Sequence, residues 1–353
     1  MAVDQETMQM LRQDYSPAPV DLSWLNLDQT WGIAAKPGKR GLTLDEVNIG
    51  PYGPDGDGSP DQTFRPRGAA RREAVPRTGY YLDKKADVWS ENATMLYEEA
   101  VQRQWSSATD IPWERLEPLP DDIERAMCQL CTFLTEVEFI AGDTPGQWVP
   151  RISNQHFETK LFLCTQIMDE ARHLDVFRKR VLANGGGLLQ GSPTSTLRTL
   201  INARDFTEMS VLMHVQAEGF VQSMFRMGEL IAQNEAEKRI FRLCAQDESR
   251  HLGYGVMHLK YVLEHEPWRR EEIHAYLDEA ETGDPETGTF GINVAESLIV
   301  LLGGGRENVD EGFKKFMALR KRQVQEYAHR LEVAGLGDRV DRMDPIMRMA
   351  LET

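Results

Sequence analysis

Several features are scarce in this sequence, and each absence narrows its function. Only four cysteines occur in 353 residues, too few for a disulfide-built scaffold. No apolar run reaches the ~20 residues that a membrane-spanning helix needs. Basic residues are outnumbered, with 40 Lys and Arg against 56 Asp and Glu, and the net charge of −16 argues against nucleic acid or anionic lipid as a partner. The first residues lack a signal-peptide pattern, so we expect a cytoplasmic protein.

The cysteines are interpreted as small core residues. Cys128 and Cys131 form a C-x-x-C pair, but the pair lies inside a helical pattern and no second pair accompanies it. Cys164 and Cys244 also lie in apolar helical stretches. We therefore expect all four thiols to pack in the core.

Three regions are predicted from composition and periodicity. Residues 1–87 are rich in Gly and Pro, which predicts an irregular arm that wraps the bundle or a partner subunit, or else a poorly ordered lead-in. Residues 88–266 repeat apolar side chains at steps of three and four, which predicts a helical bundle. Residues 267–353 predict helices that pack on that bundle. The main helices are expected at residues 88–105, 121–141, 153–182, 194–225, 235–265, 292–302 and 311–334.

One short pattern occurs twice, as Asp169-Glu170-Ala171-Arg172-His173 and as Asp247-Glu248-Ser249-Arg250-His251. Three positions separate each Glu from its His, so on a helix both side chains lie on one face and can bind one ion. Bundles that hold two metals use such a Glu-x-x-His pair on two helices and one Glu from each of two others. The sequence must therefore supply two more glutamates.

Helical periodicity selects these two glutamates. Glu138 follows Leu134 by four positions and lies on the apolar stripe, whereas Glu136 lies on a polar face. Glu218 lies on the apolar stripe of the helix predicted over residues 194–225. A carboxylate on such a stripe costs several kcal/mol unless it is paired or binds metal. The predicted ligands are Glu138, Glu170, His173, Glu218, Glu248 and His251.

Carboxylate and imidazole ligands without thiolate suit iron or manganese better than zinc or copper. Asp169 precedes His173 by four positions, as Asp247 precedes His251, so we expect each Asp to accept the ring N–H of the His on its own helix. The positive charges of Arg172 and Arg250 are expected to balance the negative charges of the additional carboxylates.

The two Asp-Glu-x-Arg-His motifs, together with Glu138 in Val-Glu-Phe-Ile-Ala and Glu218 in Ala-Glu-Gly-Phe, resemble the ferritin-like di-iron carboxylate proteins that activate dioxygen. Within that group, the chain is similar to hydroxylase subunits of bacterial multicomponent monooxygenases and to ribonucleotide reductase small-subunit-like oxidases. The resemblance covers residues 90–265. It implies an all-α, ferritin-like four-helix bundle with additional helices and an extended N-terminal arm.

The resemblance also implies the cofactors and partners. We expect two iron ions bridged by carboxylates, although Mn/Fe and Mn/Mn pairs use the same residue types. An external electron donor, a ferredoxin or a reductase, would reduce the ions, and dioxygen would be the co-substrate. A small apolar organic molecule would be oxidised in an adjacent pocket. We further expect a homo-oligomer, a dimer, and neither nucleic acid nor a membrane as partner.

Positions near the predicted ligands differ from the patterns of the related families. Phe177 stands where ribonucleotide reductase small subunits carry a radical tyrosine, which argues against a radical-generating role. Gln222 and Val221 stand where hydroxylases and acyl-carrier-protein desaturases, respectively, have a pocket threonine. Cys244 occupies the place of the additional histidine ligand of an N-oxygenase branch. These positions predict a pocket that differs from those families.

Two more residues are candidates for the pocket or for catalysis. His214 lies one turn before Glu218 and is either an added ligand or proton donor, or a hydrogen-bonded core histidine. Gln222 is either a donor to bound oxygen or substrate, or a structural amide.

The predicted function is an oxygen-dependent, monooxygenase-like oxidoreductase that hydroxylates, desaturates or otherwise oxidises an apolar molecule by two electrons. A ferroxidase- or peroxidase-type di-iron protein is one alternative. A non-catalytic structural subunit of a monooxygenase complex is another, although such subunits tend to lose the ligands and all six are present here.

Overall fold

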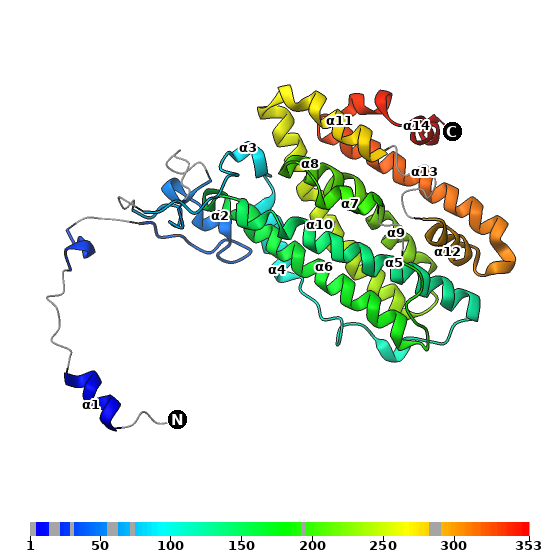
Figure 1. Cartoon of the computed structure of the whole chain (residues 1–353), viewed down its shortest axis with the longest axis horizontal. Coiled ribbons are helices and arrows are strands. Elements are labelled where there is room, and N and C mark those ends of the chain that lie inside the picture. Colours follow the sequence, from blue (N-terminus) through cyan, green and yellow to red (C-terminus); the bar gives the residue numbers. More distant parts are fainter. Residues whose placement is uncertain are drawn as a thin grey trace.

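The computed structural model describes residues 5–13, 22–28, 32–54, 63–70, 75–191, 195–281 and 291–352. Within these ranges the regular structure is helical, without a β-strand. The long helices lie side by side along the molecule (Figure 1). The prediction of an all-α bundle is confirmed. None of the described helices is long and apolar enough to cross a membrane.

Four helices form the part of the bundle that carries the predicted ligands. They are α5 (Asp121–Gly146), α6 (Phe157–Ala183), α9 (Glu218–Ile231) and α10 (Glu235–His265). Helix α5 packs against α6, α9 packs against α10, and the two pairs meet where α6 contacts α10. Glutamates of all four helices can therefore reach a common interior.

The other elements extend this bundle or connect its parts. The remaining α-helices are α1 (Gln5–Gln13), α2 (Leu44–Val47), α3 (Lys85–Val88), α4 (Ala93–Gln102), α7 (Ser195–Ile201), α8 (Phe206–Ser210), α11 (Arg270–Glu281), α12 (Ile292–Gly303), α13 (Val309–Val333) and α14 (Pro345–Glu352). Short 3-10 helices lie at Ser23–Leu25, Gly50–Tyr52, Trp113–Arg115, Val149–Arg151, Asn154–His156, Pro267–Arg269, Arg306–Asn308 and Gly337–Arg342.

Helix α10 has the bounds that the sequence predicts, and its first turn shows why. The Asn234 side chain accepts a hydrogen bond of 2.9 Å from the backbone N–H of Glu237, which caps the free N–H groups of that turn. Glu235 and Glu237 place negative charge where the helix dipole is positive.

The predicted continuous helix over residues 194–225 is wrong, because this stretch is divided. Helices α7 and α8 are separated, and Asp205 caps α8 by accepting a hydrogen bond of 2.8 Å from the Glu208 N–H. A π-helical segment, Val211–Ala217, then joins α8 to α9. Segments of this kind widen a helix by one residue per turn and are frequent at functional sites. Glu218, a predicted ligand, follows the segment directly.

Neighbouring helices hold the π-helical segment from two sides. From α13, Arg330 donates a hydrogen bond of 3.1 Å from Nε to the carbonyl oxygen of Val215. From α10, Gly255 lies so close to the segment that a Cβ at this position would be 2.3 Å from the Cβ of His214. The segment therefore depends on an arginine and a glycine that are distant from it in sequence.

The predicted helix over residues 88–105 is also broken, between α3 and α4. Side chains from α6 and α10 bind the carbonyl groups at the break. Tyr254 donates its hydroxyl to the Val88 oxygen at 2.5 Å, and Thr159 donates to the same oxygen at 3.1 Å. The ring of His258 contacts the Trp89 oxygen at 2.8 Å. These bonds replace the hydrogen bonds that a continuous helix would make.

Two described segments of the N-terminal arm, residues 32–54 and 63–70, are anchored to α6. Arg67 forms a salt bridge with Glu158, with Nη1 to Oε2 at 3.0 Å, and both side chains are buried. Asn48 donates to Oε1 of the same glutamate at 2.9 Å. These two segments therefore dock on the bundle.

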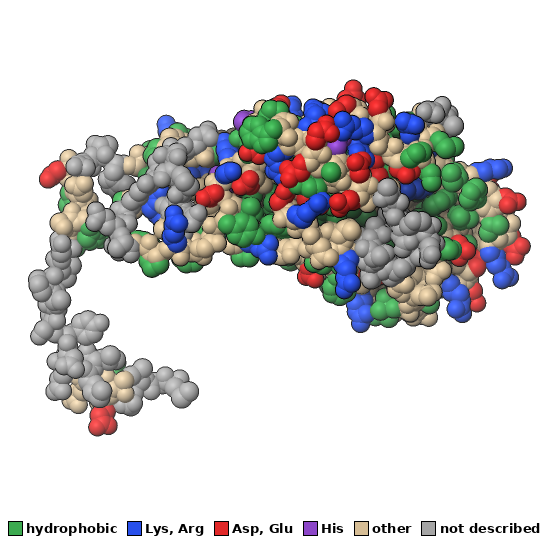
Figure 2. Space-filling view, turned by 45° about the horizontal axis from the view of Figure 1, so that its top comes forward, with side chains coloured by type: hydrophobic (Ala, Val, Ile, Leu, Met, Phe, Trp, Pro, Cys, Tyr) green, Lys and Arg blue, Asp and Glu red, His purple; other side chains and the backbone are tan. Residues whose placement is uncertain are grey.

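The C-terminal helices cover the opposite flank, where α12 and α13 pack on each other, on α5 and on α9. The buried guanidinium of Arg339 donates to both carboxylate oxygens of Glu281, at 3.0 and 2.7 Å, and fixes the chain after α13 onto α11. On the face shown in Figure 2, acidic and basic side chains are intermixed and form no basic stripe.

Three of the four cysteines are buried, but Cys164 is exposed, so its interpretation as a core residue is wrong. On α6 the buried neighbours are Leu163 and Gln166. Cys164 is rotated by about 100° from Leu163, which turns it toward the outer face of the helix.

Replacement of Gly255 by alanine should destabilise the fold by about 1–3 kcal/mol, because the new methyl group would overlap His214. Gly253→Ala is the matched control on the same helix, since a Cβ there is 3.7 Å from its nearest neighbour, and alanine should stabilise the helix by up to ~1 kcal/mol. Urea unfolding of both variants measures the difference. Equal effects of the two substitutions would contradict the close contact.

His258 should make the fold sensitive to acid. Burial lowers the pKa of this histidine to about 4, from an ordinary value of 6.5. Neutral His258 therefore stabilises the folded state fully above pH 6.5. This stabilisation is lost as the pH falls through 4, and the free energy of unfolding decreases by up to about 3 kcal/mol. The free energy of unfolding of the wild type should decrease more between pH 6.5 and 4 than that of His258→Gln. Parallel pH profiles would refute this assignment.

Candidate metal centre

The two Glu-x-x-His pairs face each other from α6 and α10. On α6, Glu170 Oε2 lies 3.1 Å from His173 Nδ1, and on α10, Glu248 Oε2 lies 3.3 Å from His251 Nδ1. Each glutamate also reaches across to the other helix. His173 Nδ1 is 3.2 Å from Glu248 Oε1, and His251 Nδ1 is 3.1 Å from Glu170 Oε1.

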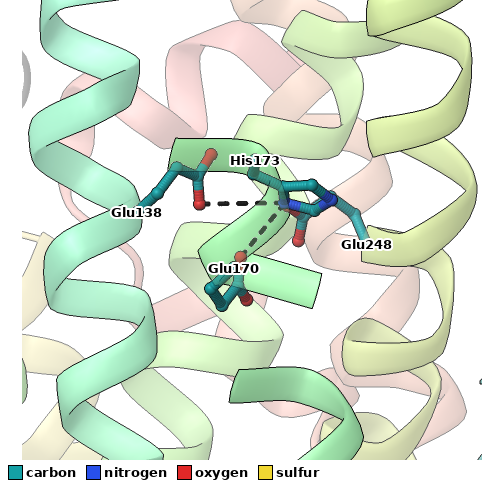
Figure 3. Close-up of side chains that lie close together, drawn as sticks. All are labelled: Glu138, Glu170, His173 and Glu248. Carbon is teal, nitrogen blue, oxygen red and sulfur yellow. Dashed lines mark hydrogen bonds and ion pairs between the residues drawn. The ribbon is translucent and has the colours of Figure 1, made fainter. Parts of the chain in front are cut away.

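Two glutamates that belong to neither Glu-x-x-His pair, here called the lone glutamates, complete the arrangement. Glu138 on α5 points toward His173, with Oε2 3.9 Å from Nδ1 (Figure 3). Glu218, the first residue of α9, places Oε1 3.7 Å from Nδ1 of His251. The structure thus brings all six predicted ligand side chains into one buried cluster.

The cluster contains two overlapping groups, each of which could hold an ion. Glu138, Glu170, His173 and Glu248 form one, and Glu170, Glu218, Glu248 and His251 form the other, with ligand atoms within 4.8 Å of one another. Glu170 and Glu248 belong to both groups. If two ions were bound, Glu170 and Glu248 would be shared by both, while Glu138 and Glu218 would each serve one.

The donor atoms of the cluster fit metal ions. One buried oxygen on each glutamate makes no hydrogen bond of favourable geometry with the described residues, namely Glu138 Oε1, Glu170 Oε1, Glu218 Oε2 and Glu248 Oε2. A buried carboxylate oxygen without a partner is costly. Metal ions would satisfy these oxygens, and oxygen with imidazole nitrogen is a donor set that suits iron and manganese.

The acidities in the cluster reflect the same crowding. Burial, followed by the neighbouring carboxylates, raises the pKa of Glu138 and of Glu218 well above the ordinary value. Burial alone would lower the pKa values of the histidines, but nearby acidic groups raise the pKa of His173 and of His251 well above 6.5. Protons and metal ions compete for these atoms, so metal affinity should fall as the pH is lowered.

The ring nitrogens that face away from the cluster bind aspartates, but the predicted pairing is wrong. His173 Nε2 lies 3.2 Å from Asp247 on α10, and His251 Nε2 lies 3.2 Å from Asp169 on α6. Each histidine thus uses the aspartate of the opposite helix. The physical reason is that Nδ1 faces the Glu of its own helix, so Nε2 on the far side of the ring points across the gap between α6 and α10.

Two arginines close this outer layer. Arg172 pairs with Asp169 and lies 3.2 Å from Asp247, and Arg250 lies 2.8 Å from Asp169 and 2.5 Å from Asp247. Each aspartate therefore contacts both arginines, and all four side chains are buried. The arginines balance the aspartates, as the sequence predicts.

Trp105 is a further member of this layer that the sequence reasoning missed. Its Nε1 donates to Asp247 Oδ2 at 2.7 Å, and its ring stacks on His173 with a centroid distance of 6.3 Å. Trp105 lies outside the helices, so no periodicity links it to the motif. Only its apolar character and the helix end nearby could have pointed to it.

A small apolar cavity of about 30 Å³ lies beside Glu138, Glu170, Glu218 and Glu248. Helices α5, α7 and α9 and the π-helical segment provide its apolar wall, with Val137, Ile140, Ala141, Leu197, Leu200, Met213, Ala217 and Val221. The predicted pocket residue Val221 is among them, while Phe177 packs on Phe225 and Phe241 in the core. The volume is about that of one water molecule.

Gln222 does not line this cavity, so its prediction as a pocket residue is wrong. Its amide donates to the Ser249 hydroxyl at 2.7 Å on the partly exposed side of α9. The inner face of α9 follows Glu218, Val221 and Phe225, and Gln222 lies at the edge of that face.

His214 is a buried, hydrogen-bonded core histidine. Its Nε2 lies 3.1 Å from Gln166 Oε1 and its Nδ1 lies 2.9 Å from Ser210 Oγ, so both nitrogens have partners outside the cluster. Burial, followed by the charges of His251 and His258, lowers its pKa to about 3. Of the two interpretations, the added ligand is excluded by this geometry.

Cys244 is buried next to His173, and burial raises the pKa of its thiol to about 12. A thiol with such a pKa stays protonated at neutral pH and is a poor metal ligand.

Asp247→Ala should destabilise the protein by about 3–5 kcal/mol, because Arg172 and Arg250 would lose a buried counter-charge. Asp175→Ala on α6 is the control, since that aspartate is exposed and its pair with Lys179 contributes about 0–1 kcal/mol. Denaturant unfolding of the metal-free proteins measures both. Similar losses in the two variants would contradict the described network.

No protein-family model matches the chain, and no curated protein matches its sequence. Solved structures do match, and several of them are R2-like ligand-binding oxidases. One with an aerobically reconstituted Mn/Fe cofactor is 16% identical, with a TM-score of 0.51, over 69% of this chain and 93% of that one. A variant with an aerobically reconstituted Fe/Fe cofactor is 17% identical, with a TM-score of 0.52, over 69% and 94%. The chain therefore has the fold of the R2-like ligand-binding oxidases, a ferritin-like helical bundle.

Proposed function

We propose that this chain is a non-heme di-metal oxidoreductase that activates dioxygen and oxidises an apolar organic substrate, by hydroxylation or desaturation. The observation that carries the proposal is the buried cluster of four glutamates and two histidines, in which Glu138 Oε1 and Glu218 Oε2 have no hydrogen-bond partner among the described residues. The fold supports it, since similar structures hold Mn/Fe or Fe/Fe cofactors. When bound, a pair of such ions supplies the electrons that reduce dioxygen.

The residues of the chain divide the work around the ions. Glu170 and Glu248 would bridge two ions, which we propose to be iron with iron or manganese with iron. His173 and Glu138 would complete one position, and His251 and Glu218 the other. The Asp and Arg layer behind the histidines fixes the ring orientations, which keeps Nδ1 directed at the ions.

The apolar cavity supports an apolar substrate. Its wall removes water from the side of the cluster where Glu138, Glu218 and Val221 meet. Helix α7 forms part of that wall through Leu197 and Leu200. A substrate larger than one water molecule requires part of this wall to move outward, and we propose that α7 is the part that moves.

An external electron donor, a ferredoxin or a reductase, belongs to the same proposal, because the described side chains provide no other source of electrons for repeated turnover. We also propose a cytoplasmic homodimer, in keeping with the acidic composition.

The size of the cavity favours a second candidate. A volume of about 30 Å³ has no room for an organic molecule. A ferroxidase or peroxidase would need less additional space than an enzyme that oxidises organic molecules. Oxygen consumption that is unaffected by a panel of apolar compounds, with Fe(II) as the only reductant oxidised, would favour this second function.

Anaerobic loading of the purified chain with Fe(II), followed by exposure to air, tests the proposal. Two ion positions predict two irons per chain, oxygen uptake and a transient change in the visible spectrum. Glu170→Ala and His251→Ala should lose bound iron and reduce oxygen uptake at least tenfold, since both remove a donor atom of the cluster.

Glu136→Ala is the matched control, because Glu136 is on the same helix as Glu138 but outside the cluster. It should keep both irons. Full iron content and oxygen uptake in Glu170→Ala, or absence of iron binding in the wild type, would overturn the proposed function.

A further inference from the structure

A chain of buried hydrogen bonds runs from the cluster into the bundle. Gln166 on α6 donates from Nε2 to Glu218 Oε1 at 2.9 Å. Gln166 Oε1 lies 3.1 Å from His214 Nε2, and His214 Nδ1 lies 2.9 Å from Ser210 Oγ. All four side chains are buried. Ser210, His214 and Glu218 lie on α8, the π-helical segment and α9, whereas Gln166 lies on α6.

The carboxylate fixes the direction of every bond in this chain. As a metal ligand Glu218 would be a carboxylate, which only accepts hydrogen bonds, so Gln166 presents its N–H₂ group to it, at 2.9 Å in this structure. The amide oxygen of Gln166 then accepts, which requires the proton of His214 to be on Nε2. Nδ1 consequently accepts from the hydroxyl of Ser210. His214 thus prevents the Gln166 amide from turning over and presenting its oxygen to Glu218.

The other half of the duplicated site lacks this arrangement. Gln166 is four residues before Glu170, and the corresponding residue four before Glu248 is Cys244. His214 is four residues before Glu218, and the residue at the same sequence distance before Glu138 is Leu134. The half of the site with Glu218 thus has an amide and an imidazole at these positions, and the half with Glu138 has a thiol and an alkyl group.

The consequence is visible at the two lone glutamates. Glu218 Oε1 accepts a hydrogen bond from Gln166, which leaves Oε2 for an ion. Glu138 Oε1 has no such donor among the described residues, and its other oxygen, Oε2, faces His173 at 3.9 Å. One lone glutamate is held in place by an amide, and its counterpart is not.

We propose that Gln166 and His214 are positioning residues that hold Glu218 and make the two metal positions unequal, with the position at Glu218 and His251 binding its ion more tightly. The inference rests on the proposed di-metal site. Its basis is that a fixed donor orients a ligand before the ion arrives, whereas Glu138 must be ordered by the ion itself.

Titration of the metal-free full chain with Mn(II), with free Mn(II) followed by electron paramagnetic resonance, tests this inequality. The wild type should bind two ions in separate steps. Gln166→Leu should weaken the tighter step about 10–100-fold and leave the weaker step unchanged, because only one position loses its oriented ligand. Gln166→Met, which has a more flexible side chain, should weaken the tighter step to the same extent.

Gln129→Leu is the matched control. Gln129 is a buried amide on α5 that exchanges two hydrogen bonds with the backbone of Gln190, at 2.7 and 3.2 Å, and has no link to the cluster. This variant should keep both steps of Mn(II) binding. Thermal unfolding of every metal-free variant establishes that it folds.

His214 is tested by rescue and by a double-mutant cycle. His214→Leu should weaken the tighter step, and His214→Gln should restore most of it, because glutamine can place an N–H donor at the position of Nε2. The double variant Gln166→Leu with His214→Leu should bind no more weakly than Gln166→Leu alone, since His214 acts through Gln166.

Equal weakening of both steps, unchanged steps in Gln166→Leu, or additive effects in the double variant would overturn the inference while the di-metal site stands. A wild type that binds no Mn(II) and no Fe(II) would remove the proposed function, and the inference with it.

Discussion

The burial of four carboxylates in one apolar bundle is the constraint on which the rest of this structure depends. Their ligand atoms lie within 4.8 Å of the neighbouring ones, where like charges repel strongly. The surrounding residues alternate in charge away from the centre. Histidines follow the glutamates, aspartates bind the histidines, and arginines bind the aspartates. The charge of each layer is balanced by the opposite charge of the next layer. Because the partners in these pairs lie on different helices, the pairs tie the helices to one another.

The sequence predicts much of this centre because the ligands obey helical periodicity. Glu170 and His173 are found by their spacing, and the second copy of the motif removes the ambiguity of a single one. Only its position on the apolar stripe distinguishes Glu138 from Glu136 as a candidate ligand, and the structure places Glu138 in the cluster. Helix α10 keeps its predicted bounds because its cap and its stripe are both local.

The parts that escape prediction depend on contacts between elements. The exchange of aspartates between α6 and α10 follows from the direction of the imidazole rings, which one helix cannot reveal. The break at Trp89 and the π-helical segment before Glu218 depend on distant partners such as His258 and Arg330. Gln166 could have been found, since it lies one turn before Glu170 on the same face, but only Glu218 gives it a purpose.

The π-helical segment before Glu218 also affects how this chain must be compared with others. A π turn holds one residue more than an α turn. A related chain with an uninterrupted α-helix between the positions of Ser210 and Glu218 is therefore one residue shorter there. An alignment that forbids a gap in this helix would shift His214 and Met213 out of register while the ligands remain aligned. Conservation scores would then understate the residues that line and support the centre.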